Sequence, residues 1–261
     1  MIRGPSTDAD AKPDASGEIT EDRLLGGRVR LLQPTKGYRA GMDAALLAAA
    51  CDAQAGERVL DVGCGPGAVL LAAAARRPDA RFWGLERDPE ALELARRGAA
   101  LNGMQDRVES IGGDVAQGFA ALKLRAFEAV LSNPPFFDDA GAIRGPHPAR
   151  RGAYLADDGL DAWIGFLSKA AREGGTITVI HRADRLADLL ILLSAKCGGI
   201  RIRPVHPFAD TPAKRVLVRA VKTGKAPLEL LAPLILHDRS GGKHTPEAEA
   251  ILRGEAALGW S

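Results

Sequence analysis

Apolar runs of strand length alternate with helical segments from residue 57 onward, and this alternation limits the possible fold more than any other feature. The short runs are typical of buried strands, and the segments between them have the apolar spacing of helices. The expected strands are 58–61, 81–86, 108–111, 127–132, 176–181, 200–205 and 215–221. The expected helices are 68–76, 89–102, 160–172 and 185–197, with a shorter helical stretch over 119–124.

This alternation predicts an α/β fold. We expect a Rossmann-like, doubly wound, mostly parallel sheet of seven strands with helices on both faces. The last two strands follow each other without a helix, so we expect an antiparallel hairpin at one edge of the sheet. Before the alternation, 24–32 is expected to be a strand or hairpin arm, and Asp43 to be the N-cap of a helix over 44–51. A helix over 246–253 is expected near the end.

Two segments fall outside this pattern. Residues 1–20 are polar with little aliphatic content and are expected to be a disordered tail, followed by a single domain over 21–261 with small N-terminal and C-terminal extensions. The connection 137–159 is longer than ordinary loops, which favours either a lid over a substrate or a disordered segment without function.

Composition narrows the class of protein. A chain of 261 residues, 46% of them hydrophobic, is long enough for a sizeable core. It has neither an apolar run long enough to span a membrane nor a signal-peptide pattern at its start, so we expect a soluble, cytoplasmic protein. Its three cysteines, Cys51, Cys64 and Cys197, form no CxxC pair, which predicts buried thiols rather than a disulfide framework or a metal site.

A glycine-rich loop follows the first strand of the alternation. Gly63, Gly65 and Gly67 stand between a strand and a helix, where side chains would block the approach of a ligand to the backbone. Glu86, at the end of the next strand, is placed to bind two ribose hydroxyls, and Asp114, after the third, to bind an adenine amino group. The loop also satisfies the dinucleotide-binding pattern, so it does not separate a dehydrogenase from a methyltransferase.

A rigid turn, Asn133-Pro134-Pro135-Phe136, ends the fourth strand. The prolines fix φ and remove two backbone donors, which leaves carbonyl groups as free acceptors. The Asn133 side-chain oxygen and a neighbouring carbonyl can accept both hydrogens of an exocyclic NH2 group, and Phe136 offers a face to a flat ring. The alternative is an ordinary strand-end turn beside a core phenylalanine.

Together these motifs resemble the class I S-adenosylmethionine-dependent methyltransferases, whose loop reads Asp-x-Gly-x-Gly-x-Gly, as do Asp61, Gly63, Gly65 and Gly67 here. The turn 133–136 matches their amino-methylating branch. Several further segments are similar to the bacterial valine-tRNA (adenine-N6) methyltransferase family: 26–34, 37–43, 145–151, 214–217, 234–237 and 245–248.

The resemblance implies S-adenosylmethionine as the cofactor and no metal. Asp61 would position its amino-acid end, Glu86 the ribose and Asp114 the adenine, although Asp61 is equally placed to cap a helix and Asp114 to begin a turn. Further implied cofactor contacts are Tyr38, Arg39, Gly63, Gly65, Gly67, Arg87, Val115 and Asn133. The implied catalytic residues are Asn133, Pro134, Pro135 and Phe136.

The implied reaction is methylation of an exocyclic amine, most simply N6 of an adenosine in tRNA. Asn133 Oδ1 and the Pro134 carbonyl would accept the two amine hydrogens and stabilise the charge that develops on nitrogen, so that no strong base is needed early. Phe136 would stack on a base that has left its own stack.

The charge distribution adds a weaker indication of an RNA partner. Residues 1–143 contain 17 Lys/Arg and 21 Asp/Glu, whereas residues 144–261 contain 18 and 12. Clustered basic residues can follow a phosphate backbone. The residues expected to contact RNA are Arg28, Arg30, Lys36, Arg150, Arg151, Lys214 and Arg215. The alternatives are a protein glutamine methyltransferase, an rRNA base methyltransferase and a non-catalytic RNA-binding protein, and the oligomeric state is left open.

Overall fold

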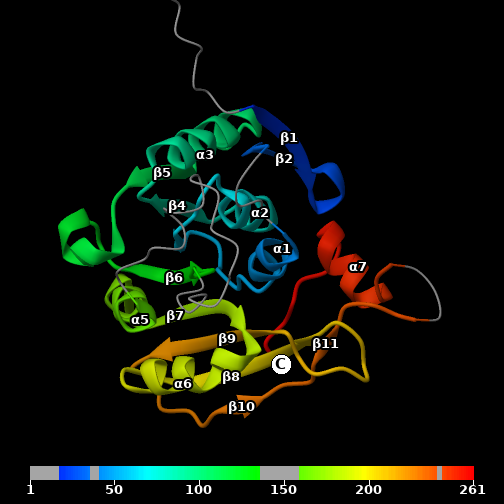
Figure 1. Ribbon diagram of the computed structural model, residues 1–261. Helices are drawn as coiled ribbons and strands as arrows, with labels where there is room; N and C mark the ends of the chain where they lie inside the picture. Colours follow the sequence, from blue (N-terminus) through cyan, green and yellow to red (C-terminus); the bar gives the residue numbers. More distant parts are fainter. Residues whose placement is uncertain (1–17, 36–40, 136–158, 240–242) are drawn as a thin grey trace, which may run out of the picture.

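The computed structural model describes residues 18–35, 41–135, 159–239 and 243–261, which form a central sheet with helices on both faces (Figure 1). Five parallel strands make up the middle of the sheet: β3 (Arg58–Val62), β4 (Arg81–Glu86), β5 (Val108–Gly112), β6 (Phe127–Ser132) and β7 (Ala171–Arg182). They pair in the order β5-β4-β3-β6-β7. The strand order reverses between β3 and β6, and in open α/β sheets ligands bind outside the carboxyl ends of the strands at such a point.

The far side of the sheet is antiparallel. β9 (Arg215–Lys222) lies between β7 and β8 (Cys197–His206) and runs against both. β8 is therefore parallel to β7, and it ends at the same edge of the sheet as β3 and β6. Two short strands, β10 (Glu229–Leu230) and β11 (Leu234–Ile235), pair with β8 and bring the sheet to nine strands. This arrangement confirms the expected fold and its antiparallel hairpin, and adds the two short strands.

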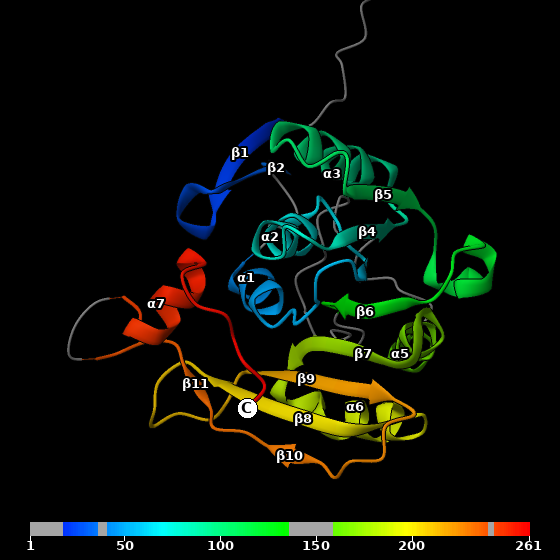
Figure 2. The ribbon, with the colours of Figure 1, turned by 180° about the vertical axis from the view of Figure 1, so that it is seen from behind.

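Helices cover the two faces with separate hydrophobic clusters (Figures 1 and 2). One face carries α1 (Met42–Ala49), α2 (Ala68–Arg76) and α3 (Pro89–Leu101), and the other carries α5 (Gly159–Ala170) and α6 (Leu186–Ser194). Side chains alternate between faces along a strand. Val130 and Leu131 accordingly belong to different clusters although they are neighbours in β6.

The two ends of the described chain pack against the α1–α3 side. A hairpin of β1 (Ile19–Leu24) and β2 (Val29–Pro34) is attached through Asn102, which accepts a hydrogen bond from the Arg30 amide at 2.9 Å and donates one to the Arg30 carbonyl at 2.7 Å. Near the C-terminus, α7 (Pro246–Arg253) is followed by Trp260, whose Nε1 donates to the Ala50 carbonyl at 2.9 Å. Figure 2 shows α7 beside α1.

Most expected elements are confirmed, and α2, β4, β6 and α7 have the expected bounds. Asp43 is not an N-cap: Gly41 holds that position, and Asp43 lies in the first turn of α1 with its carboxylate on Arg215. The helical stretch after β5 is a 3-10 turn, Phe119–Leu122. Ile19 and Thr20, assigned above to the tail, belong to β1.

Two expectations from composition also bear on the described residues. All three cysteines are buried, as expected of thiols that serve as small hydrophobic side chains. No helix within the described residues is long and apolar enough to cross a membrane.

Candidate functional site

The candidate site lies where β3, β4 and β6 end, at the point where the strand order reverses. Because these strands are parallel, the loops that follow them meet at one edge of the sheet, which we call the catalytic edge. The glycine loop follows β3, Glu86 ends β4, and Asn133 follows β6. The structure thus brings together the principal motifs singled out in the sequence.

The glycine loop 63–67 is fixed to β4 and shaped by its neighbours. The amides of Gly63 and Cys64 both donate to the Leu85 carbonyl, at 2.8 and 3.0 Å. A Cβ on Gly63 would lie 2.9 Å from the Trp163 ring, so no larger side chain fits there. A Cβ on Gly65 would meet no described atom within 4 Å, yet this residue has φ +54°. Among the described residues nothing covers Gly65, which leaves its backbone open to a ligand.

Asp61 is the buried carboxyl group beneath this loop. Its side chain is 1% exposed, and it accepts a hydrogen bond from the Leu70 amide in the first turn of α2. Its Oδ2 is buried and has no hydrogen-bond partner among the described residues. Burial, followed by repulsion from the Glu86 carboxylate, raises the pKa of Asp61 to about 8. The contact with α2 agrees with the helix-capping alternative and leaves one oxygen for a ligand.

The carboxylate of Glu86 joins the ends of β3 and β4. Its Oε2 accepts from the Gly65 amide at 2.8 Å, and its Oε1 accepts from the amides of Arg87 and Asp88, both at 2.9 Å. Three backbone donors fix the orientation of this carboxylate, which is half-buried. A fixed, partly exposed carboxylate at a strand end suits the binding of two ribose hydroxyls.

Two further residues expected to contact the cofactor, Asp114 and Val115, lie one strand further out, after β5. Asp114 caps the 3-10 turn Val115–Gln117 by accepting from the Ala116 amide at 3.0 Å, and its Oδ2 lies 3.7 Å from Arg87 Nη1. The turn-initiating alternative for Asp114 is therefore present in the structure. Val115 is 7% exposed and packs in the α5–α6 cluster, so any contact it makes with a ligand comes from its backbone.

The turn at residues 133–135, which we call the acceptor turn, rests on a contact between Trp163 and Ser132 that the sequence did not indicate. Trp163 Nε1 donates to Ser132 Oγ at 2.8 Å, and Ser132 Oγ donates to the Val62 carbonyl at 2.8 Å. Both side chains are buried, and the ring of Trp163 also lies against Gly63. Trp163 therefore joins the last residue of β6, immediately before Asn133, to the start of the glycine loop. Asn133 itself is half-buried and Pro134 is buried.

The residues expected to contact RNA are not all at the catalytic edge. Lys214 precedes β9 there and is exposed, and Arg215 begins β9 with its Nε 2.8 Å from Asp43 Oδ2. Arg28 instead donates to the Arg253 carbonyl at 2.8 Å, and Arg30 forms a 2.7 Å ion pair with Glu21. Their hairpin packs at the C-terminal end of α3, toward the opposite edge. Lys36, Tyr38, Arg39, Phe136, Arg150 and Arg151 lie outside the described residues, as does most of the connection 137–159.

The described residues at the catalytic edge have groups that fit the parts of S-adenosylmethionine. The cofactor carries an amino-acid end with an ammonium group, a ribose and an adenine. Within the described part of the chain, the structure offers a buried carboxylate oxygen without a partner at Asp61, an oriented carboxylate at Glu86 and an uncovered backbone at Gly65. These groups lie at the ends of neighbouring strands, so one ligand can contact all of them.

Comparison with known proteins agrees with this geometry. Residues 39–144 match the family described as methyltransferase small domain. A tRNA1(Val) (adenine(37)-N6)-methyltransferase of Porphyromonas gingivalis is 31% identical over 80% of this chain and 85% of its own length. The protein of the same name from Yersinia enterocolitica is 35% identical over 82% and 84%.

Two other relatives are informative. A release factor glutamine methyltransferase of Burkholderia pseudomallei is 37% identical, over 56% of this chain and 54% of its own length. The crystal structure of Atu636 from Agrobacterium tumefaciens, titled a predicted O-methyltransferase, has 30% identity and a TM-score of 0.66, over 83% of this chain and 98% of that one.

Identity above 30% across most of both chains, together with the shared fold and motifs, establishes the family. The chain belongs to the tRNA1(Val) (adenine(37)-N6)-methyltransferase family and is a class I S-adenosylmethionine-dependent N-methyltransferase.

Proposed function

We propose that this protein methylates N6 of an adenosine in tRNA, at position 37 of tRNA1(Val), as the names of its full-length relatives state for those proteins. The observation that carries the proposal is the acceptor turn at residues 133–135, which follows β6 directly beside the glycine loop. Ser132 and Val62, the last residues of β6 and β3, are paired in the sheet and joined by a hydrogen bond. This pairing supports a site in which the group to be methylated and the methyl donor would lie next to each other.

The chemistry of the turn favours an amine over a hydroxyl group as the acceptor. An amide oxygen at Asn133 and a carbonyl at Pro134 are two acceptors, which match the two hydrogens of an NH2 group, whereas a hydroxyl group has only one hydrogen. Pro134 and Pro135 carry no amide hydrogen, so these two residues add no backbone donors that would compete with the acceptors. The same argument separates this chain from O-methylating enzymes that share its fold.

S-adenosylmethionine, when bound, supplies an electrophilic methyl group on a sulfonium. The protein's own contribution is to align the amine with that group, and positioning of this kind can supply roughly 7 to 11 kcal/mol of the barrier. Asn133 Oδ1 and the Pro134 carbonyl hold the amine hydrogens and stabilise the positive charge that grows on nitrogen. Asp61 would hold the ammonium group of the cofactor's amino-acid end, and Glu86 would hold the ribose.

Glutamine methylation is the second candidate, because the Burkholderia relative is 37% identical where it matches. A glutamine side-chain amide also has two hydrogens and would suit the same pair of acceptors. That relative, however, matches over only 54% of its own length, whereas the tRNA enzymes match over 84% and 85%. Coverage of both chains favours tRNA.

The test is transfer of tritiated methyl groups from S-adenosylmethionine to three substrates: an unmodified tRNA1(Val) transcript, ribosomal RNA and a release factor. We expect label in the tRNA, recovered as N6-methyladenosine after digestion to nucleosides. A transcript with guanosine at position 37 is the matched control and is expected to take up no label. Label in the release factor, or equal label in both transcripts, would contradict the proposal.

A further inference from the structure

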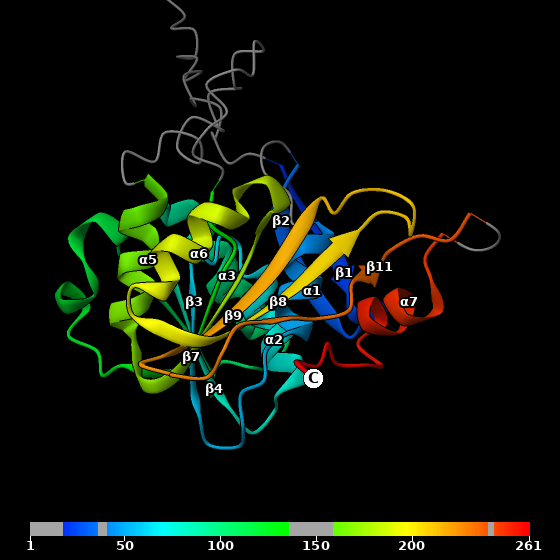
Figure 3. The ribbon, with the colours of Figure 1, turned by 90° about the horizontal axis from the view of Figure 1, so that it is seen from below.

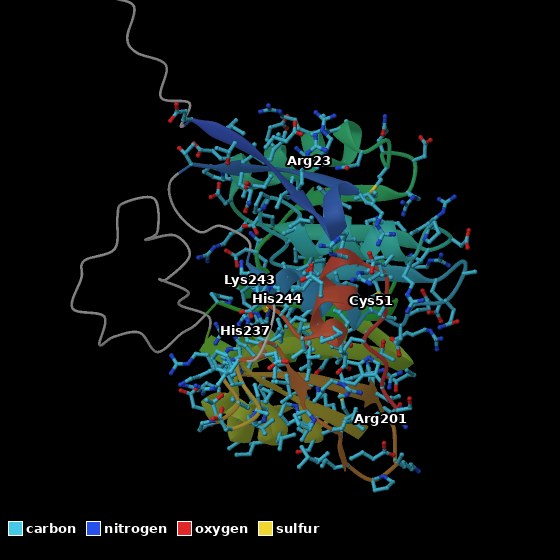
Figure 4. All side chains as sticks on the ribbon, turned by 90° about the vertical axis from the view of Figure 1, so that its right-hand side faces the viewer. Arg23, Cys51, Arg201, His237, Lys243 and His244 are labelled. Atoms are coloured by element: carbon cyan, nitrogen blue, oxygen red, sulfur yellow. The ribbon has the colours of Figure 1, made fainter. Side chains whose placement is uncertain are left out.

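A stack of one guanidinium and three rings lies on the surface where β8 and β11 end. The Arg239 guanidinium carbon is 4.5 Å from the centre of the Phe208 ring. The Phe208 and His237 ring centres are 5.4 Å apart at an interplanar angle of 45°, and those of His237 and His244 are 5.0 Å apart at 25°. We call these four residues the surface stack. Figure 4 shows His237, Lys243 and His244 together, away from Arg201.

Three chain segments hold the surface stack in place. The His237 amide donates to the Pro207 carbonyl at 2.9 Å, which joins the segment after β11 to the segment after β8. His237 Nδ1 and the Lys243 carbonyl are 2.6 Å apart, and Thr245, the N-cap of α7, donates through Oγ1 to the Ile235 carbonyl at 2.7 Å. These bonds order the rings before any partner arrives.

The surface stack does not serve either hydrophobic core. Phe82 packs in one core cluster, and Phe119, Phe127 and Phe166 pack in the other. Phe208 is the single phenylalanine among the described residues that lies outside both clusters. It is half-buried, as are His237 and His244, and the side chain of Arg239 is 64% exposed. Phe208 and His237 lie between neighbours within the stack, so a partner that binds by stacking would meet its two ends, His244 and Arg239.

The location agrees with a role in substrate binding. β8 is parallel to β7, so β8 ends with His206 at the catalytic edge. β11 runs beside β8 in the same direction. Figure 3 shows the connection from β8 to β9 and the segment after β11 extending from this part of the sheet. Three strand spacings separate β6 from β8, which is roughly 14 Å. Stacked nucleotides rise about 3.4 Å each, so a base roughly four or five nucleotides from the methylated one can reach the rings.

The charges around the surface stack are mixed. Lys243 and Lys214 are exposed and positive, whereas Arg239 is paired with Asp210 at 3.0 Å. Asp238 is a second carboxylate there. The site is therefore only weakly cationic, which favours binding through ring faces over binding through phosphate charge.

We propose that the surface stack binds an unpaired base of the substrate RNA, at a position remote from the methylated adenosine. The inference rests on the proposed function, since it names a second contact with the same RNA. Aromatic side chains hold unpaired bases because every base has a flat face, and Arg contributes through its planar guanidinium.

The experiment compares His244→Ala with His244→Phe in the full-length protein, using fluorescence anisotropy of a labelled, unmodified tRNA1(Val) transcript. Loss of one stacked ring should weaken binding roughly 5- to 100-fold, whereas Phe keeps the ring and should stay within about threefold of the natural protein. The slope of log affinity against log salt should be equal in all three, because no phosphate contact is lost. Affinity for S-adenosylmethionine and kcat should be unchanged while KM for tRNA rises.

Equal affinity of His244→Ala and the natural protein, or equal losses in the Ala and Phe variants, would overturn the proposal. Phe208→Leu, which keeps an apolar side chain of similar size, provides a second test if thermal unfolding shows that His244→Ala has lost its fold. These outcomes are distinct from failure of the proposed function. In that case the natural protein would transfer no methyl group to tRNA, whereas failure of the surface stack alone leaves methylation of tRNA intact.

Discussion

Asn133 is the residue at which chemistry and cofactor binding can be separated. Its oxygen is expected to stabilise charge that exists only as the carbon–nitrogen bond forms. Asn133→Ala should therefore lower kcat by roughly 100- to 1,000-fold, the usual effect of removing one such hydrogen-bonding partner. Affinity for S-adenosylmethionine, measured by calorimetry, should change little. Equal losses in both quantities would place Asn133 in the cofactor site instead.

Asp61 should link cofactor binding to proton release. Burial raises its pKa to about 8, and a cationic amino group placed beside it would favour the carboxylate form. Binding of S-adenosylmethionine at pH 7 should therefore release a proton, detected as a binding heat that differs between buffers of different ionisation enthalpy. Asp61→Asn should abolish this difference. Identical heats for the natural protein in both buffers would contradict the assignment.

The same carboxyl group has a consequence for stability, with a definite sign. An unfolded Asp has a pKa of about 3.9, so between about pH 4 and pH 8 the folded protein keeps a proton that the unfolded chain has lost. Stability without cofactor should fall as the pH rises through that window. In Asp61→Asn this dependence should be weaker, which urea unfolding at several pH values would measure.

Trp163 is the residue beside the candidate site that the sequence could not reveal. Asp61, Glu86 and Asn133 belong to local motifs, whereas Trp163 meets Ser132 across 31 positions and appears in the sequence only as one apolar residue of a helix. Trp163→Phe and Ser132→Ala should each cost about 1 kcal/mol of unfolding free energy and slow methyl transfer. Ser132→Ala also removes the hydrogen bond to the Val62 carbonyl, but the Trp163–Ser132 bond is lost in both single variants, so the double variant should lose less than the sum. If the losses of unfolding free energy in the two single variants add up to the loss in the double variant, Trp163 and Ser132 are not energetically coupled.

At the scale of elements, alternation of strands and helices was enough to place the parallel half of the sheet. The alternation could not predict that β9 lies between β7 and β8. The order of two strands joined without a helix depends on which of them pairs with β7. Ion pairs between β9 and the α1 region help to hold β9 next to β7. Arg215 and Arg219, four residues apart on one face of β9, reach Asp43 at the start of α1 and Asp52 beyond its end, at 2.8 and 2.7 Å.

These two ion pairs should fasten α1 to the sheet. Arg219 is the better buried of the two arginines, with 16% of its side chain exposed. Arg219→Met keeps most of the apolar stem and should cost about 1 to 2 kcal/mol of unfolding free energy, because Asp52 loses a charged hydrogen-bond donor. Arg253→Met removes an arginine from an exposed pair with Glu249 and is the matched control, with a much smaller expected loss. Equal losses in urea unfolding would refute this account.

At the scale of the whole molecule, charge along the sequence differs from charge on the surface. Eight basic residues and one acidic residue lie between Lys196 and Lys225. Five of the eight, Arg201, Arg203, Arg215, Arg219 and Lys222, are bonded to carboxylates or carbonyl groups within the protein. The sequence suggested a continuous basic surface because the acidic partners come from distant segments. Three exposed lysines remain, at 196, 214 and 225.

The positions of two of these lysines allow a test of how the molecule meets RNA. Lys214 precedes β9 at the catalytic edge, whereas Lys225 follows β9 at the opposite edge. If RNA lies along the catalytic edge, Lys214→Ala should weaken binding of the tRNA1(Val) transcript and reduce the salt slope by about one. Lys225→Ala removes the same charge from the same cluster and should change neither quantity. Equal effects of the two variants would mean that RNA binding depends on the net charge of the protein and not on the position of a lysine at the catalytic edge.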